Sequence, residues 1–199
     1  MNSYKVKIIQ VGYSESLGPN RFRADGTITL ITGPNNIIFD TGLPKDKNTI
    51  LNFLKKEGLS TKDINYVICS HGHSDHIGNN NLFPNATFIV SYDICKDDIY
   101  IFHDFPSGIP YKIDEYLEVI ATPGHSSQDV SLIVKTSKGV IAIVGDLFEN
   151  VEDLFNDNLW KIFSEQPKIH AENRNRIIKL ADYIVPGHGD MFKVPNKLK

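Results

Sequence analysis

Four or five apolar runs of this sequence end at a histidine or an aspartate that has a glycine nearby. These junctions are IIFDTG at 37–42, VICSHGH at 67–73, VIATPGH at 119–125, IAIVGD at 141–146 and IVPGHG at 184–189. Buried strands that end in this way deliver imidazole and carboxylate side chains on loops at the ends of a sheet, where glycine lets the backbone turn sharply. The pattern therefore predicts a protein built on buried strands whose ends meet at one site.

Strand and helix patterns fill the chain between these junctions. Strands are predicted at 6–11, 66–69, 86–91, 117–121, 130–136, 140–144 and 183–185, with a hairpin over 27–40 that turns at residues 33–36. Apolar spacing predicts helices at 48–57 and 168–182, and Ser60 with Asp63 resembles a capping box that starts a second helical segment. Early and late strand groups, each with helices and without a linker or repeat, indicate an α/β layered fold and a single domain over residues 1–199.

The net charge and the length of the apolar runs exclude some classes of function. The 21 basic and 24 acidic residues give a net charge of −3, which excludes a global positive field that would attract nucleic acid nonspecifically. The chain does not start with a signal-peptide pattern, and no apolar run approaches the roughly 18 residues that a membrane span needs. We therefore expect a cytoplasmic or nuclear protein that is neither secreted nor bound to a membrane. Two cysteines, Cys69 and Cys95, are too few for a disulfide framework.

Five of the seven histidines lie at the junctions, and three of them fall within residues 71–76. His71 and His73 share a face if the backbone is extended. A strand-to-helix turn near Ser74 or Asp75 would then spread four candidate ligands of this motif, the three histidines and Asp75, around two metal positions. Imidazole nitrogen and carboxylate oxygen suit Zn²⁺, Fe²⁺ or Mn²⁺, and no cysteine ligand is present to separate these ions. The remaining two histidines, at positions 103 and 170, are interpreted as ordinary core or surface residues.

The order of the motifs FDTG, HGHSDH, ATPGH, GD and PGHG resembles that of the metallo-β-lactamase superfamily over nearly the whole chain. The resemblance implies a four-layer αβ/βα sandwich with a dinuclear metal site along one edge. Zn²⁺ is the expected ion, with iron or manganese as alternatives. The resemblance also implies a homodimer.

Carried over to this sequence, the family's metal ligands form two sets joined by one aspartate. The resemblance implies that His71, His73 and His125 bind the first ion, that Asp75, His76 and His188 bind the second, and that Asp146 bridges them. Asp75 is also the candidate catalytic residue, because a carboxylate beside two cations can orient a water and take its proton. Asp40 either supports the ligands from behind or forms a turn.

The closest resemblance within the superfamily is to a branch described as endoribonucleases that process the 3′ ends of histone pre-mRNA. It rests on stretches such as HGHSDHIGN, LEVIATPGH, VGDLFE and VPGHGDMFKV. We therefore expect a metal-dependent phosphodiesterase that acts on RNA. Segments 12–23 and 97–111 are candidates to wall the site, with Arg21, Arg23 and Lys112 as candidate phosphate contacts.

Three other functions stay open. A glyoxalase II-like thioesterase and an iron-dependent persulfide dioxygenase use similar ligands, although the extra C-terminal helical domain of glyoxalase II has no room after His188. A non-catalytic metal-binding protein is the third. An aspartate at position 146, where zinc-dependent β-lactamases typically place a cysteine, argues against antibiotic hydrolysis.

Overall fold

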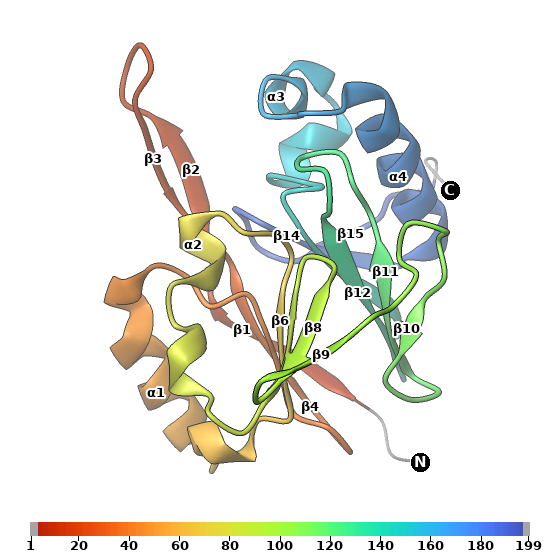
Figure 1. The fold of residues 1–199 in the computed structure, drawn as a ribbon. Coiled ribbons are helices and arrows are strands. Elements are labelled where there is room, and N and C mark those ends of the chain that lie inside the picture. The colour runs from red at the N-terminus through yellow and green to blue at the C-terminus, as the bar shows by residue number, and fades with distance from the viewer. Residues whose placement is uncertain (1–3, 197–199) are drawn as a thin grey trace.

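Two large β-sheets lie face to face in the computed structural model, which describes residues 4–196 (Figure 1). The first sheet has the order β1-β4-β5-β6-β7-β8-β9. Its strands are β1 (Lys5–Gln10), β4 (Ile28–Thr32), β5 (Ile37–Phe39), β6 (Tyr66–Cys69), β7 (Thr87–Val90), β8 (Asp93–Lys96) and β9 (Ile99–Ile101). β5, β6 and β7 run parallel to one another, so their carboxyl ends lie at the same edge of the sheet.

The second sheet has the order β10-β11-β12-β13-β14-β15. Its strands are β10 (Tyr111–Lys112), β11 (Leu117–Ala121), β12 (Val130–Thr136), β13 (Gly139–Gly145), β14 (Tyr183–Pro186) and β15 (Phe192–Lys193). β13 and β14 are parallel, so the residues that follow each of them lie side by side. A separate two-stranded hairpin, β2 (Tyr13–Ser16) and β3 (Phe22–Asp25), projects away from both sheets (Figure 1).

Helices cover the outer side of each sheet. The helical segments are η1 (Pro44–Asp46), α1 (Lys47–Lys56), η2 (Thr61–Asp63), α2 (Ser74–Ile77), η3 (Asn80–Leu82), η4 (Val151–Leu154), α3 (Asp157–Lys161) and α4 (Pro167–Leu180). Helix α1 lies beside the first sheet and α4 beside the second, on opposite sides of the molecule (Figure 1). The four layers confirm the predicted αβ/βα sandwich.

Alternation along the buried strands explains why helices cover both sheets. In β5, Phe39 faces the core between the sheets, whereas Ile38 packs with Leu54 of α1. In β13, Ile143 faces the same central core, whereas Ala142 packs with Ile177 of α4. Because neighbouring side chains of a strand point to opposite faces, two-sided apolar strands require a cover on each side.

The predicted elements agree with the observed ones wherever the sequence pattern is strong. The strands predicted at 66–69, 117–121 and 130–136 have the observed bounds, and the hairpin over 27–40 forms through β4 and β5. The second helical segment predicted after Ser60 is only the single turn η2, in which Asp63 accepts bonds from the backbone and hydroxyl of Ser60. Pairs β2–β3 and β8–β9 and helix α3 were not predicted.

A shared central core supports the prediction of one domain. Buried side chains from both sheets form one cluster, which includes Phe39, Ile68, Leu132 and Ile143. The predicted domain spans residues 1–199, of which 1–3 and 197–199 lie outside the described residues, and it stays a prediction. Within residues 4–196, no helix has the length and apolar character needed to cross a bilayer.

Candidate metal centre

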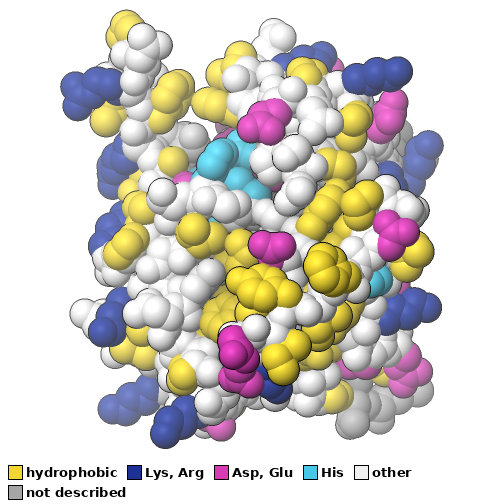
Figure 2. Space-filling model, in the orientation of Figure 1, with side chains coloured by type: hydrophobic (Ala, Val, Ile, Leu, Met, Phe, Trp, Pro, Cys, Tyr) yellow, Lys and Arg dark blue, Asp and Glu magenta, His cyan; other side chains and the backbone are white. Residues whose placement is uncertain are grey.

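The structure brings together all seven predicted metal ligands. They lie at the edge where β5, β6, β13 and β14 end, on the segment between β6 and α2, on α2 itself, on the loop between β11 and β12, and on the segments that follow β13 and β14. Histidine side chains are visible there at the surface, near the β2–β3 hairpin (Figure 2). The predicted strand-to-helix turn is confirmed, because His73 is extended and α2 begins at Ser74.

The first group consists of three imidazoles that face one point. Nδ1 of His73 lies 2.8 Å from Nε2 of His71 and 3.1 Å from Nε2 of His125. Their ligand atoms and a carboxylate oxygen of Asp146 all lie within 4.8 Å of one another. Three nitrogens and one oxygen at this spacing form a set that can hold one divalent ion.

The second group combines one carboxylate with two imidazoles. Oδ2 of Asp75 lies 3.9 Å from Nε2 of His76 and 3.8 Å from Nε2 of His188. Ligand atoms of these three residues also lie within 4.8 Å of one another. This set offers a second position for a cation.

Asp146 connects the two groups. Its Oδ2 lies 3.7 Å from Nε2 of His71 and 3.4 Å from Nε2 of His125. Toward the second group, Oδ1 lies 3.3 Å from Nε2 of His76, and Oδ2 lies 3.3 Å from Nε2 of His188. One carboxylate therefore faces ring nitrogens of both groups, as a bridging ligand must.

Hydrogen bonds from behind fix the orientation of the ligand rings. Asp40 is fully buried, and its Oδ2 lies 2.7 Å from Nδ1 of His76, which leaves Nε2 to face the site. Nδ1 of His188 donates in the same way to the carbonyl oxygen of Asp25 at 3.0 Å. Such contacts select the ring tautomer and raise the basicity of the ligand nitrogen. Asp40 also has a φ of 57°, so it both forms the turn and supports the ligand.

Two glycines allow the backbone to approach the ligands closely. A Cβ atom at Gly187 would lie 1.9 Å from Oδ1 of Asp146, so no other residue fits there without displacing the carboxylate. Gly145 has a φ of +54°, and a Cβ atom there would lie 2.3 Å from Cβ of Ser70. Gly145 and Gly187, two of the glycines noted beside the strand ends in the sequence, are therefore needed to form the site.

Burial controls the protonation of the first group. The pKa of His71 is held well below its usual value by burial and by the neighbouring His76, and burial also lowers the pKa of His125. Both rings are therefore neutral at pH 7, and a neutral ring has a nitrogen lone pair for an ion.

Neighbouring carboxylates control the protonation of the second group. Burial opposes protonation of His76, but Asp146 and Asp40 outweigh it and raise the pKa of His76 well above 6.5. In the same way, Asp146 overcomes burial at His188 and raises its pKa to about 10. Burial alone would raise the pKa of Asp146, but His188 and His76 lower it well below 3.8. Protons therefore occupy the place that a cation would take.

Buried polar atoms without partners test whether the residues fit a metal. Nε2 of His76 and Oδ1 of Asp146 are buried without a hydrogen-bond partner among residues 4–196, although they lie only 3.3 Å apart. An unsatisfied buried polar atom is costly, and metal coordination removes that cost for both atoms. Together with the nitrogen and oxygen donors, these atoms fit a divalent ion.

Glu149 and the β2–β3 hairpin belong to the surroundings of the site, and of their two roles only that of Glu149 was not predicted from the sequence. Glu149 is 6% exposed, and its Oε2 lies 3.8 Å from Nε2 of His188. Burial and the nearby Asp146 raise the pKa of Glu149 to about 8. Its position three residues after Asp146, in the turn that ends β13, was the available signal.

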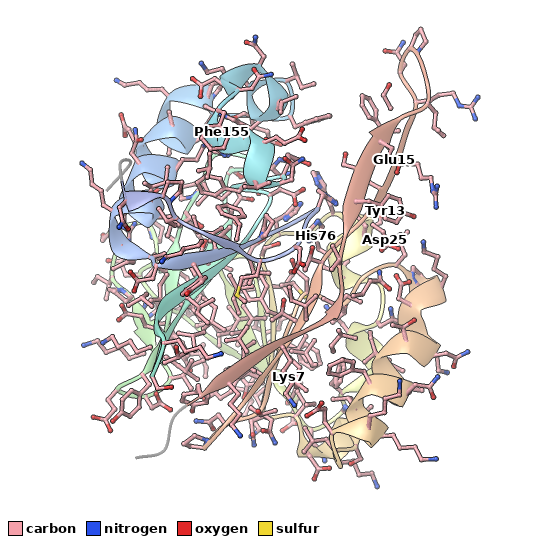
Figure 3. All side chains as sticks on the ribbon, turned by 180° about the vertical axis from the view of Figure 1, so that it is seen from behind. Lys7, Tyr13, Glu15, Asp25, His76 and Phe155 are labelled. Carbon is pink, nitrogen blue, oxygen red and sulfur yellow. The ribbon has the colours of Figure 1, made fainter. Side chains whose placement is uncertain are left out.

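A groove beside Glu149 separates the hairpin from α3. Its lining is formed by Ser14, Ser16, Phe22, Glu149, Asn150, Leu159, Ile162 and Phe163. The ring of Phe22 meets that of Phe163 edge to face, with centroids 5.4 Å apart. His76 lies near Asp25 at the base of the hairpin, whereas Tyr13 and Glu15 point outward (Figure 3). The predicted wall at 12–23 therefore borders the site.

Other candidates lie elsewhere. His170 is buried against Trp160, and His103 bonds to the carbonyl oxygen of Ile109, so both are structural. Phe105, an aromatic residue of the predicted wall at 97–111, is fully buried and is not available to a substrate. Arg23 packs over the ring of Tyr13 rather than facing the ligands.

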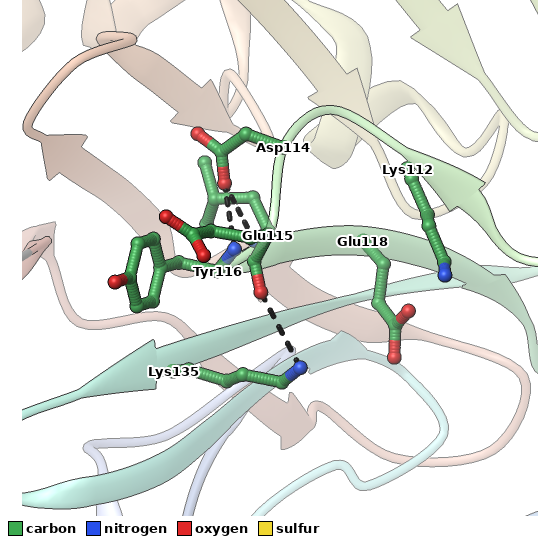
Figure 4. Close-up of a pocket in the computed structure, with 7 residues that line it drawn as sticks. Lys112, Asp114, Glu115, Tyr116, Glu118 and Lys135 are labelled. Atoms are coloured by element: carbon green, nitrogen blue, oxygen red, sulfur yellow. Dashed lines mark hydrogen bonds between the residues drawn. The ribbon is translucent and has the colours of Figure 1, made fainter.

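Lys112 lies in a different pocket, at the end of β11 opposite the metal ligands (Figure 4). Polar groups of this pocket form hydrogen bonds within the local turn. Oδ1 of Asp114 accepts bonds from the backbone N–H groups of Tyr116 and Leu117. Lys135 reaches the carbonyl oxygen of Glu115 at 3.4 Å. The predicted phosphate contact at Lys112 therefore lies outside the metal centre.

Comparison with known proteins places this geometry among metal-dependent hydrolases. A family model described as the metallo-β-lactamase superfamily matches residues 23–113. Metallo-β-lactamase domain-containing protein 1 of Xenopus laevis is 44% identical over 194 residues, which cover 96% of this chain and 82% of that protein. An N-acyl homoserine lactonase of a Bacillus species is 31% identical over 162 residues, which cover 73% of this chain and 65% of that protein.

A solved structure shows the same fold. It is an N-acyl homoserine lactone hydrolase with the product N-hexanoyl-L-homoserine bound at the catalytic metal centre. The two chains are 20% identical with a TM-score of 0.68, and the match covers 94% of this chain and 93% of the other.

Proposed function

The chain belongs to the metallo-β-lactamase superfamily, and from that premise we propose that it is a hydrolase that uses two divalent ions to cut RNA. Asp146 carries the two-ion part of this proposal, because its carboxylate faces both groups of ligands. Zn²⁺ is the expected ion at the first group, since three imidazoles and one carboxylate suit it. When bound, two ions polarise the scissile group and lower the pKa of a shared water.

Exposure separates the roles of the two carboxylates. The side chain of Asp146 is 5% exposed and lies behind the imidazoles, whereas that of Asp75 is 17% exposed. Asp75 is therefore the carboxylate that an incoming water reaches, and it can orient the water and accept its proton. His73 is also exposed, so substrate approaches from the side of His73 and Asp75.

The groove beside the metal centre supports a nucleic-acid chain as substrate. Phe22 is 52% exposed and contacts Phe163, and exposed aromatic rings along a groove can stack unpaired bases. The resemblance of the sequence to RNA-cutting relatives points the same way. With a net charge of −3, binding relies on the ions and the groove rather than on long-range attraction. The predicted compartment and homodimer stay predictions.

Hydrolysis of a carboxylic ester, lactone or thioester is the second candidate. The observation that favours it is the apolar part of the groove, which includes Leu159 and Ile162 and suits an acyl chain as well as a base. The relative named as an N-acyl homoserine lactonase adds support.

A comparison of substrates tests both functions. Wild-type protein, Asp75→Asn and the exposed control Asp93→Asn are saturated with metal, analysed for metal content by mass spectrometry, and assayed on single-stranded RNA, a lactone and a thioester. We expect RNA cleavage by the wild type and the control, and a loss of about 10²- to 10⁴-fold in Asp75→Asn.

Each other outcome changes the proposal. Cleavage of the lactone or thioester alone would select the second candidate, and full turnover by metal-loaded Asp75→Asn would remove its catalytic role. One bound iron without hydrolysis would favour the dioxygenase, and two bound ions without any turnover would favour a non-catalytic metal-binding protein.

A further inference from the structure

Glu149 is held beside the second group of ligands by its own backbone. Its N–H donates to Oδ2 of Asp153 at 2.7 Å, and its carbonyl oxygen accepts from the N–H of His188 at 2.8 Å. The second of these bonds ties Glu149 directly to a predicted metal ligand. The position of its side chain is therefore set by the same contacts that form the metal centre.

The carboxylate of Glu149 lies beside two predicted ligands of the second ion, His188 and Asp146. Its Oε2 is 3.8 Å from Nε2 of His188, which is also the distance from Oδ2 of Asp75 to the same nitrogen. Ligand atoms of Asp146, Glu149 and His188 all lie within 4.8 Å of one another. The distances to His188 therefore do not distinguish Glu149 from Asp75.

Burial gives the second argument. Glu149 is 6% exposed, and the imidazole that faces its carboxylate, that of His188, lies 3.8 Å away, beyond hydrogen-bonding distance. Asp146, a second buried carboxylate, belongs to the same cluster. Two buried carboxylates side by side are unfavourable unless positive charge compensates them, and a bound cation would take over this role from the protonated imidazoles of His76 and His188.

We propose that Glu149 is a further ligand of the second ion, and this inference rests on the two-ion centre proposed above. The second position would then draw its donors from two groups that share His188, one formed with Asp75 and His76 and the other with Asp146 and Glu149. Oxygen-rich sets suit Mn²⁺ better than sets dominated by imidazole do. The two positions therefore differ in metal preference, with the harder ion at the second.

Metal binding by the intact chain tests this inference without an activity assay. Stripped wild type, Glu149→Gln and the exposed control Glu152→Gln are titrated with Mn²⁺ and with Zn²⁺ in competition with a chelator, without substrate because Glu149 also lines the groove. Glutamine keeps the shape but removes the negative charge. The visible absorption of Co²⁺-loaded protein, which strengthens as the coordination number falls, gives an independent readout.

We expect Glu149→Gln to bind the second Mn²⁺ at least 10- to 100-fold more weakly, the loss typical of removing a residue that only orients a ligand, and to bind the first ion as the wild type does. The Co²⁺ absorption of the second position should strengthen, and Glu152→Gln should match the wild type. Equal affinity of wild type and Glu149→Gln for both ions, or equal loss in the control, would overturn the inference alone. A wild type that binds only one ion would overturn the two-ion centre as well.

Discussion

The two halves of the metal centre differ in how they are prepared for an ion. His71, His73 and His125 form a half made of imidazoles, in which burial lowers the pKa of His71 and His125. Asp75, His76 and His188 form a half that carboxylates surround, and there the pKa values of both imidazoles are raised. The same residue type is therefore neutral in one half and protonated in the other.

This difference shows that the charges of neighbouring groups decide whether a histidine is protonated when two histidines are buried to a similar degree. His71 and His76 are both almost fully buried, but His76 lies between Asp40 and Asp146. Desolvation disfavours the charged imidazole, and two close carboxylates reverse that preference. The first half is ready to bind, whereas the second must release protons first.

Replacing Asp146 by asparagine should have the largest effect, because it removes the carboxylate that both halves share. Bridging and charge compensation amount to several kcal/mol, so we expect turnover to fall by on the order of 10³-fold, with weaker binding of both ions. Metal content and single-turnover rates measure this. The exposed Asp190→Asn serves as control, and an Asp146→Asn protein that keeps both ions at wild-type affinity would show that the halves are independent.

Replacing Asp40 by asparagine should have a smaller effect, and it should weaken the two halves of the metal centre to different degrees. Asp40→Asn keeps the side-chain volume but removes the charged acceptor of His76 Nδ1. Asp40 contacts His76 directly and reaches His71 only through the hydroxyl of Ser70, so we expect about 10- to 100-fold weaker binding of the second ion and a smaller change at the first. Calorimetric titration resolves the two steps. Equal weakening at both steps would mean that Asp40 supports the whole edge rather than one ligand.

The pH dependence of binding should show the smallest effect per step, about tenfold per pH unit for each proton released. In the metal-free protein, charged His188 contributes stability that is complete below pH 6.5 and is lost as the pH rises through about 10. An ion must displace that proton, so affinity for the second ion should rise between pH 7 and 9. His71 and His125 titrate below 6.5, so the first ion should depend less on pH. Titrations in buffers of different ionisation enthalpy count the protons, and identical counts for both ions would contradict the comparison.

Much of the sandwich was predictable because its signals are local. Strands such as 117–121 and 130–136 are apolar runs between turn residues, and periodicity alone gives their bounds. The β2–β3 hairpin was missed because YSES and FRAD are polar and show no buried face. α3 has only five residues, too few to show a helical period.

The sequence by itself determined which donors are available, since each ligand follows an apolar run and glycines flank most of those junctions. Tertiary structure alone decided which ring nitrogen faces the site and which side chains share an ion. The carbonyl oxygen of Asp25 orients His188 across 163 positions, and the turn after β13 places Glu149 against the same ring. These contacts depend on how the two sheets pack at one edge. The spacing of residues within a single segment of the sequence does not specify how close residues of different segments come. Local patterns record the chemistry of the residues, whereas coordination and protonation depend on neighbours that only folding brings together.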